Sequence, residues 1–294
     1  MDALLEPLRY EFFVWALVAA GLVGTVTAVV GTFVVLKGLA FIGDAVSHAA
    51  FPGLVVAFLL QGPYLLGAAV AAIATSLAIG YVSQRTRLRM DTTIGVLFAG
   101  MFALGIFLFS TIRGFVADMF SFLFGNVLAI TTVDLVSLTI LSAIVLVTVA
   151  AFWKELLYST FDPLGAAAAG LRVELLEYLF LGLVGVTIVV SLQAVGIILV
   201  VAMLVTPAAT AQLLVVRFTR MMAIALGVGV GSAIAGLYLS YWLDAASGAT
   251  IVLVQTGLFL LSLAFGPRTG LLARRRGRGL AGRDARTGTI EGAD

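Results

Sequence analysis

The chain has 294 residues, of which 62% are hydrophobic and only 11% are charged, and its formal net charge is +2 at pH 7. This composition, with a mean hydropathy of +1.18, excludes a soluble globular domain and indicates an integral membrane protein. The chain contains no cysteine, which excludes disulfides and thiolate metal sites.

Apolar segments long enough to cross a bilayer recur from the N-terminal region almost to the C-terminus. About 18 to 25 apolar residues in a helix span a hydrocarbon core of about 30 Å. Cutting the chain at charges, prolines and glycines predicts nine spans, at 12–36, 41–60, 64–84, 92–111, 133–152, 174–192, 194–214, 221–242 and 249–267. The expected fold class is therefore all-α, a polytopic transmembrane helical bundle over residues 1–267. An eight-span version results if one segment is re-entrant.

The positions of the basic residues predict the orientation of this bundle. Fifteen of the 17 Lys and Arg residues fall on one side of the predicted spans, and only Arg9 and Arg113 fall on the other. The positive-inside rule then places the N-terminus outside and the C-terminus in the cytoplasm. Residues 268–294 form an Arg-rich tail that we expect to be disordered and to contact anionic lipid, with no role in binding nucleic acid.

Two ionisable residues interrupt the second apolar segment. Asp44 and His48, the only histidine of the chain, lie in the stretch 43–53. Four residues apart on a helix, their side chains share one face, so a carboxylate oxygen and an imidazole nitrogen could bind one small cation. This pair of ligand atoms suits Mn²⁺, Zn²⁺ or Fe²⁺ better than Cu⁺, and ionisable residues within a bilayer indicate function. The alternative is structural: the two side chains pair with each other, or cap a helix that is broken at Pro52 and Gly53.

The sequence argues against two catalytic activities. A serine protease fits poorly, because adjacent Ser47 and His48 point about 100° apart on a helix and the chain has no Gly-x-Ser-x-Gly elbow. ATP hydrolysis fits poorly too, because neither Lys37 nor Lys154 follows the glycine spacing of a Walker A loop. The chain is therefore not expected to be an enzyme, and any ATPase would be a separate subunit.

The amphipathic segment 154–172, on the predicted inside, is the place where such a subunit would dock. Asp162 followed by Pro163 predicts a helix N-cap and first turn, Ala166 to Ala169 predict a short helix, and Gly170 predicts its end. An ordinary loop between two spans is the alternative.

Together these residues resemble the permease subunits of the ABC-3 family, which are the membrane components of bacterial ABC importers for manganese, zinc and iron. Three stretches carry the resemblance in the expected order, namely 35–53, 161–170 and 191–211. The most specific is the first, where Gly43, Asp44 and His48 stand in the order Gly-Asp-x-x-x-His with Pro52 and Gly53 close behind.

The resemblance implies a type II ABC importer-like fold, with Asp44 and His48 as metal ligands in the translocation path. It also implies that no cofactor is bound permanently and that the cargo is a divalent metal ion. Lys37-Gly38 and residues 46–53 are more similar to the manganese branch than to the zinc branch, so Mn²⁺ is favoured and Zn²⁺ and Fe²⁺ are the alternatives.

The resemblance further implies a set of partners in the bacterial plasma membrane. These are a second copy of the chain, cytoplasmic ATP-binding subunits and an extracytoplasmic metal-binding protein. The coupling helix that seats in the ATPase would include Phe161, Asp162, Pro163, Gly165, Ala166 and Gly170. Leu164 and Gly165 depart from the more acidic pattern of other importers.

Two other classes of transporter remain open at this point. A permease of the siderophore or cobalamin type would use a wide apolar vestibule without obligatory metal ligands. An ion-coupled secondary transporter would use Asp44 and His48 to relay protons, with no ATPase present.

Overall fold

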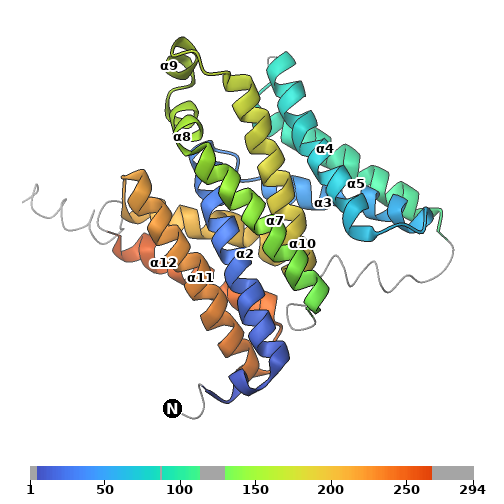
Figure 1. Cartoon of the computed structure of the whole chain (residues 1–294), viewed down its shortest axis with the longest axis vertical. Helices are drawn as coiled ribbons and strands as arrows, with labels where there is room; N and C mark the ends of the chain where they lie inside the picture. The colour runs from blue at the N-terminus through green and yellow to red at the C-terminus, as the bar shows by residue number, and fades with distance from the viewer. Residues whose placement is uncertain (1–4, 87, 113–129, 267–294) are drawn as a thin grey trace, which may run out of the picture.

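A computed structural model describes residues 5–86, 88–112 and 130–266 of the chain (Figure 1). All regular elements in these ranges are helical: η1 (Pro7–Arg9), α2 (Glu11–Leu36), α3 (Ile42–Leu59), α4 (Tyr64–Arg85), α5 (Met90–Ser110), α7 (Thr132–Ala151), α8 (Trp153–Phe161), α9 (Pro163–Ala168), α10 (Val173–Leu214), α11 (Phe218–Leu243) and α12 (Ser247–Phe265). The basic tail predicted at 268–294 lies outside the described residues.

Nine helical segments within these ranges are long and apolar enough to cross a membrane, which confirms the helical bundle expected from the sequence. The ends of the segments agree closely with the predicted spans because charges and turn residues bound the apolar runs. The largest difference is at α11, which begins at Phe218 and not at 221. The prediction started the span after Arg220, but Arg220 is exposed and lies within the first turn of α11. The helix therefore begins about one turn earlier, with Arg217 as its N-cap.

Helix α10 contains two of these segments, Val173–Leu192 and Ala194–Leu214, joined across a break. Gly196 has φ 78° and ψ 169° at this point, a conformation that glycine adopts without the steric cost of a Cβ. Figure 1 shows the first half of α10 upright and its second half lying across the bundle behind α2. The sequence correctly separated two segments here.

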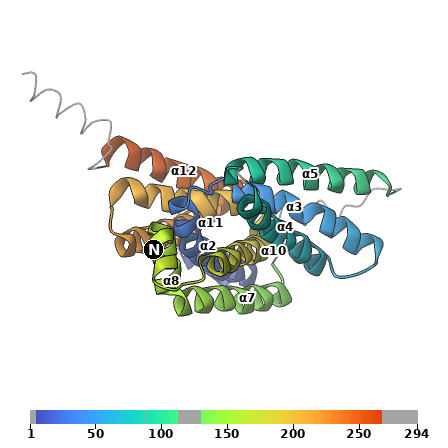
Figure 2. The ribbon, with the colours of Figure 1, turned by 90° about the horizontal axis from the view of Figure 1, so that it is seen from above.

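Helices α2 and α10 form the centre of the bundle. Helix α10 contacts α2, α3, α4, α7, α11 and α12. In the apolar membrane-spanning part of α2, 61% is buried within the protein, against 17% in that of α5 and of α12. The two views of the ribbon agree that α3, α4 and α5 gather on one side of this centre and α11 and α12 on the other (Figures 1 and 2). Helix α3 thus lies between the central helices and an outer pair.

Glycines bring the helix backbones into direct contact. A Cβ on Gly53 of α3 would overlap the carbonyl of Gly67 on α4, and a Cβ on Gly31 of α2 would overlap the carbonyl of Leu204 on α10. Close approach of this kind is how helices associate in lipid, where no hydrophobic force drives them together. The contact at Gly53 fixes α3, and hence Asp44 and His48, against its neighbour.

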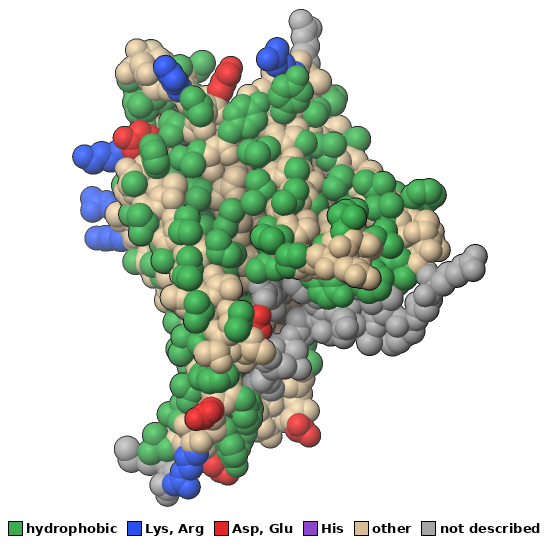
Figure 3. All heavy atoms as spheres, turned by 45° about the vertical axis from the view of Figure 1, so that its right-hand side comes forward, with side chains coloured by type: hydrophobic (Ala, Val, Ile, Leu, Met, Phe, Trp, Pro, Cys, Tyr) green, Lys and Arg blue, Asp and Glu red, His purple; other side chains and the backbone are tan. Residues whose placement is uncertain are grey.

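The outer surface is suited to a bilayer. Figure 3 shows hydrophobic side chains over the middle of one face, with the coloured Lys, Arg, Asp and Glu side chains mostly toward its upper and lower ends. Figure 1 places α8 and α9 at the end of the bundle opposite to the N-terminus. The chain is thus a multi-pass membrane protein with one short helical hairpin, α8 and α9, at one end.

Candidate functional site

A tight turn connects α2 to α3. Lys37 caps α2, Gly38 has φ 71°, and the amide N–H of Leu39 donates to the carbonyl of Val34 at 2.9 Å. This is a Schellman-type ending, which requires a residue that tolerates positive φ after the helix. Helix α3 begins at Ile42 directly afterwards, so Asp44 falls in its first turn, where the helix dipole favours a negative charge.

Asp44 and His48 share one face of α3, as their spacing predicted. The Nε2 of His48 lies 3.4 Å from Oδ1 of Asp44, and the side chains are 28% and 45% exposed, respectively. Both groups are therefore in contact with each other and accessible from outside the chain.

The structural details argue against two of the alternatives raised by the sequence, a pair that caps a broken helix and a serine protease. Helix α3 continues through Pro52 to Leu59, so Pro52 and Gly53 do not end a helix that the pair would cap. Ser47 is fully buried, and its hydroxyl donates to the carbonyl of Gly43 at 2.7 Å. Ser47 is thus turned away from His48 and cannot act with it as a nucleophile.

Two aromatic side chains that the sequence did not single out hold His48 from α5. The imidazole packs edge to face against Phe98 and Phe102, with ring centroids 5.5 and 5.1 Å away. The two phenyl rings stack on each other at 6.0 Å. The i, i+4 spacing of Phe98 and Phe102 could have indicated an aromatic face on α5. That this face contacts His48 is visible only from the packing of α3 against α5.

The geometry of the pair fits a first-row divalent ion. Two ligand atoms that each lie about 2.1 Å from one ion are about 3.0 Å apart at a right angle and about 3.4 Å apart at the tetrahedral angle. The observed separation of 3.4 Å matches the distance expected when both atoms bind one ion. Among the described residues no group of three or more His, Cys, Asp or Glu side chains could hold a metal, so no site within these ranges of one chain offers more than two such side chains.

The second predicted site, residues 161–170, forms a capped helix. Asp162 is the N-cap of α9, its Oδ1 accepts from the amide N–H of Gly165 at 2.8 Å, and Pro163 occupies the first turn. Gly170 has φ 87°, and the N–H of Leu171 donates to the carbonyl of Ala166. The predicted N-cap, short helix and glycine stop are all present, and the preceding segment forms a further helix, α8.

The side chains of this region divide into two kinds. Ala166 is fully buried, and a Cβ on Gly165 would overlap the carboxylate of Asp162, so these residues shape α9 from within. Leu164, in contrast, is 83% exposed, and Phe161 is 61% exposed. Leu164, which was not among the predicted contact residues, is therefore a large apolar side chain that α9 presents openly.

A bundle of membrane-length helices with an ionisable pair on an inner helix defines the class of protein: a polytopic membrane transport subunit. The chain belongs to the ABC 3 transport family, whose sequence pattern matches residues 9–266. This membership confirms the resemblance read from the three stretches, and the chain is a permease subunit.

Individual relatives agree with this family. The chain is 47% identical to the manganese transport system membrane protein MntC of Halalkalibacterium halodurans over 92% of both chains. It is 39% identical to the chelated iron transport system membrane protein YfeC of Yersinia pestis, covering 94% of this chain and 93% of that one. Among solved structures, PsaBC from Streptococcus pneumoniae in complex with Fab matches with a TM-score of 0.81 and 34% identity, covering 93% of this chain and 99% of that chain.

Proposed function

We propose that this permease passes a divalent transition-metal ion across the bacterial plasma membrane, with Asp44 and His48 as the ligands that the ion meets on its way. The observation that carries the proposal is the 3.4 Å separation of the carboxylate oxygen and the imidazole nitrogen on a partly exposed face of α3. A two-ligand site binds weakly, and weak binding suits a path that an ion must enter and leave.

Mn²⁺ is the favoured cargo. A carboxylate oxygen and an imidazole nitrogen suit Mn²⁺ and Fe²⁺, and the chain has no cysteine to favour softer or thiolate-seeking ions. The relative from Halalkalibacterium halodurans is named for manganese and the one from Yersinia pestis for chelated iron. Mn²⁺ therefore ranks first, Fe²⁺ second, and Zn²⁺ remains a competitor to be tested.

A second copy of the chain would complete the coordination. Asp44 and His48 are open to the outside of one chain, and a two-fold axis beside α3 would bring two such pairs together as four ligands. A homodimer also agrees with the closed symmetry that most oligomers adopt.

Separate subunits would supply the energy and the cargo. An ATP-binding subunit would dock on α9, whose Leu164 projects from the end of the bundle. A metal-binding protein would dock at the opposite end, where Figure 1 places the N-terminus. This arrangement has the N-terminus outside and the C-terminus in the cytoplasm, as the basic residues predicted.

Transport by the reconstituted complex tests the metal site. We expect ATP-dependent uptake of ⁵⁴Mn²⁺ into vesicles to be lost with Asp44→Asn and with His48→Ala while the complex still assembles. Asp91→Asn, which changes an exposed acid on α5 paired with Arg89 at 3.9 Å, is the matched control and should retain uptake. Competition by Fe²⁺ and Zn²⁺ ranks the cargoes. Uptake that persists in both variants would favour a siderophore-type path without obligatory ligands.

Co-purification tests the docking of the ATPase. Leu164→Asp should release the ATP-binding subunit in detergent, because it replaces a large, 83% exposed apolar side chain of α9 with a charged one. The same substitution at Leu60, which is 76% exposed in the turn between α3 and α4, is the control and should leave the complex intact. Mn²⁺ uptake that needs no ATPase would identify an ion-coupled secondary transporter instead.

A further inference from the structure

Aromatic side chains from four helices meet beneath α8. We call this cluster the aromatic junction; its members are Phe33 of α2, Trp153 and Phe161 of α8, Phe180 of α10 and Phe218 of α11. Phe33 is fully buried and Phe180 is 1% exposed. The junction therefore joins the core of the bundle to the hairpin that carries the proposed docking helix.

Phe218 is the ring on which α8 rests. The ring of Trp153, at the start of α8, lies 5.2 Å from that of Phe218, and the ring of Phe161, at the end of α8, lies 6.3 Å from it. Phe33 contacts the same ring at 5.1 Å. These separations lie in the range that aromatic pairs prefer, so both ends of α8 are connected through Phe218 to α2.

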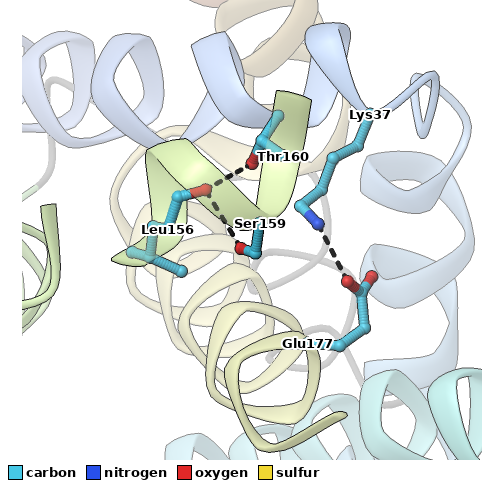
Figure 4. A network of polar contacts seen from close by, with 5 residues as sticks. All are labelled: Lys37, Leu156, Ser159, Thr160 and Glu177. Atoms are coloured by element: carbon cyan, nitrogen blue, oxygen red, sulfur yellow. Dashed lines mark hydrogen bonds and ion pairs between the residues drawn. The ribbon is translucent and has the colours of Figure 1, made fainter. Parts of the chain in front are cut away.

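An ion pair adjoins this junction. Nζ of Lys37 donates to Oε2 of Glu177 at 2.8 Å, and the two side chains are only 11% and 19% exposed (Figure 4). The Lys37 Nζ also lies 5.4 Å from the centroid of the Phe180 ring. A largely buried ion pair holds its partners together firmly, because removal of either group leaves the other charge unpaired.

The two residues of the ion pair lie next to the two segments that the proposed function uses, α9 and α3. Glu177 lies in the second turn of α10, which follows α9 after the turn at Gly170. Lys37 is the C-cap of α2 and immediately precedes the turn into α3, the helix that carries Asp44 and His48. The aromatic junction and the ion pair thus connect both sides of the α8–α9 hairpin to the segment that leads into the metal pair.

We propose that Phe218 and the Lys37–Glu177 pair are positioning residues that couple movement of α9 to movement of the α2–α3 turn, and through that turn to Asp44 and His48. The inference rests on the proposed function, in which α9 receives the ATP-driven movement. Closely packed rings and a buried ion pair deform little when one of their helices moves. A displacement of α8 therefore displaces α2 as well.

The test measures two rates in the same reconstituted complex, ⁵⁴Mn²⁺ uptake and ATP hydrolysis. We expect Phe218→Ala to lower the number of ions carried per ATP by about tenfold, because contacts to three rings are lost, while hydrolysis stays within about twofold of wild type. Phe107→Ala, on α5 at 67% exposure, is the matched control and should leave the ratio unchanged. Phe218→Leu retains most of the apolar volume and so controls for misfolding. It should give a ratio of ions to ATP between those of wild type and Phe218→Ala.

A charge exchange tests the ion pair independently of packing. Lys37→Glu should lower the ratio, and the combination with Glu177→Lys should restore it at least in part, because the exchanged charges can pair again. The inference is overturned if Phe218→Ala, Phe218→Leu and Lys37→Glu all carry as many ions per ATP as wild type. Failure of the proposed function looks different: wild type would then carry no Mn²⁺, or Asp44→Asn would carry as much as wild type.

Discussion

Phe98 and Phe102 offer a quantitative test of how His48 is held for a metal. The two rings pack against the imidazole from α5 at 5.5 and 5.1 Å between centroids. Replacing either ring by alanine frees the imidazole to rotate away from Asp44. Binding of an ion must then select the competent orientation, and the apparent dissociation constant rises as the populated fraction of that orientation falls.

The size of the effect follows from the contacts. An edge-to-face aromatic pair contributes about 0.5–1.5 kcal/mol beyond the burial of its area. If this energy determines the orientation of His48, one substitution weakens binding by about 2- to 12-fold, and the double substitution weakens it by about 5- to 150-fold.

The assay is equilibrium dialysis of ⁵⁴Mn²⁺ against the permease–ATPase complex, without the extracytoplasmic binding protein, so that the dissociation constant belongs to the permease. The control is Phe107→Ala on the same helix, whose ring is 67% exposed. The reasoning is refuted if the double variant binds Mn²⁺ as tightly as wild type, or if Phe107→Ala weakens binding to the same extent.

Three further predictions concern stability and assembly. Gly53→Ala should cost about 1–3 kcal/mol in thermal unfolding because its Cβ meets the carbonyl of Gly67, whereas Gly95→Ala, in open space, should not destabilise; equal stability of the two variants would contradict the packing. Asp162→Ala should weaken retention of the ATPase by removing a cap worth about 1 kcal/mol, and Asp162→Asn, which can still cap, should restore it. Gln255 is fully buried, and its amide atoms have no hydrogen-bond partner among the residues that the structure describes, so Gln255→Met should raise the unfolding temperature; a lower temperature would indicate a bound water or a further partner.

Much of the fold could be predicted from the sequence because charges and turn residues bound the apolar runs. The two halves of α10 were separated correctly, although the break itself lies at Gly196 and not at Gln193. The α9 cap was predictable as well, because Asp162, Pro163 and Gly170 act within a few residues of one another.

The contacts between distant segments could not be read in this way. Lys37 entered the sequence analysis only as a rejected Walker A lysine and as part of the resemblance to the manganese branch. Glu177 was not considered, because the pairing of these two residues depends on α2 and α10 being neighbours. The same holds for Phe98 and His48, which belong to helices whose contact no local pattern reveals. The residues that surround the candidate site therefore came from long-range packing, whereas the proximity of the proposed ligands Asp44 and His48 was predicted from their spacing.

The most direct test of the central claim is electron spin-echo spectroscopy of Mn²⁺ bound to the complete permease–ATPase complex. Because His48 is the only histidine of the chain, a ¹⁴N modulation from imidazole that is present in wild type and lost in His48→Ala assigns the ligand. We predict this loss, together with weaker Mn²⁺ binding in Asp44→Asn. A ¹⁴N signal that survives in His48→Ala, or a wild-type complex that binds and transports Mn²⁺ without one, would contradict it.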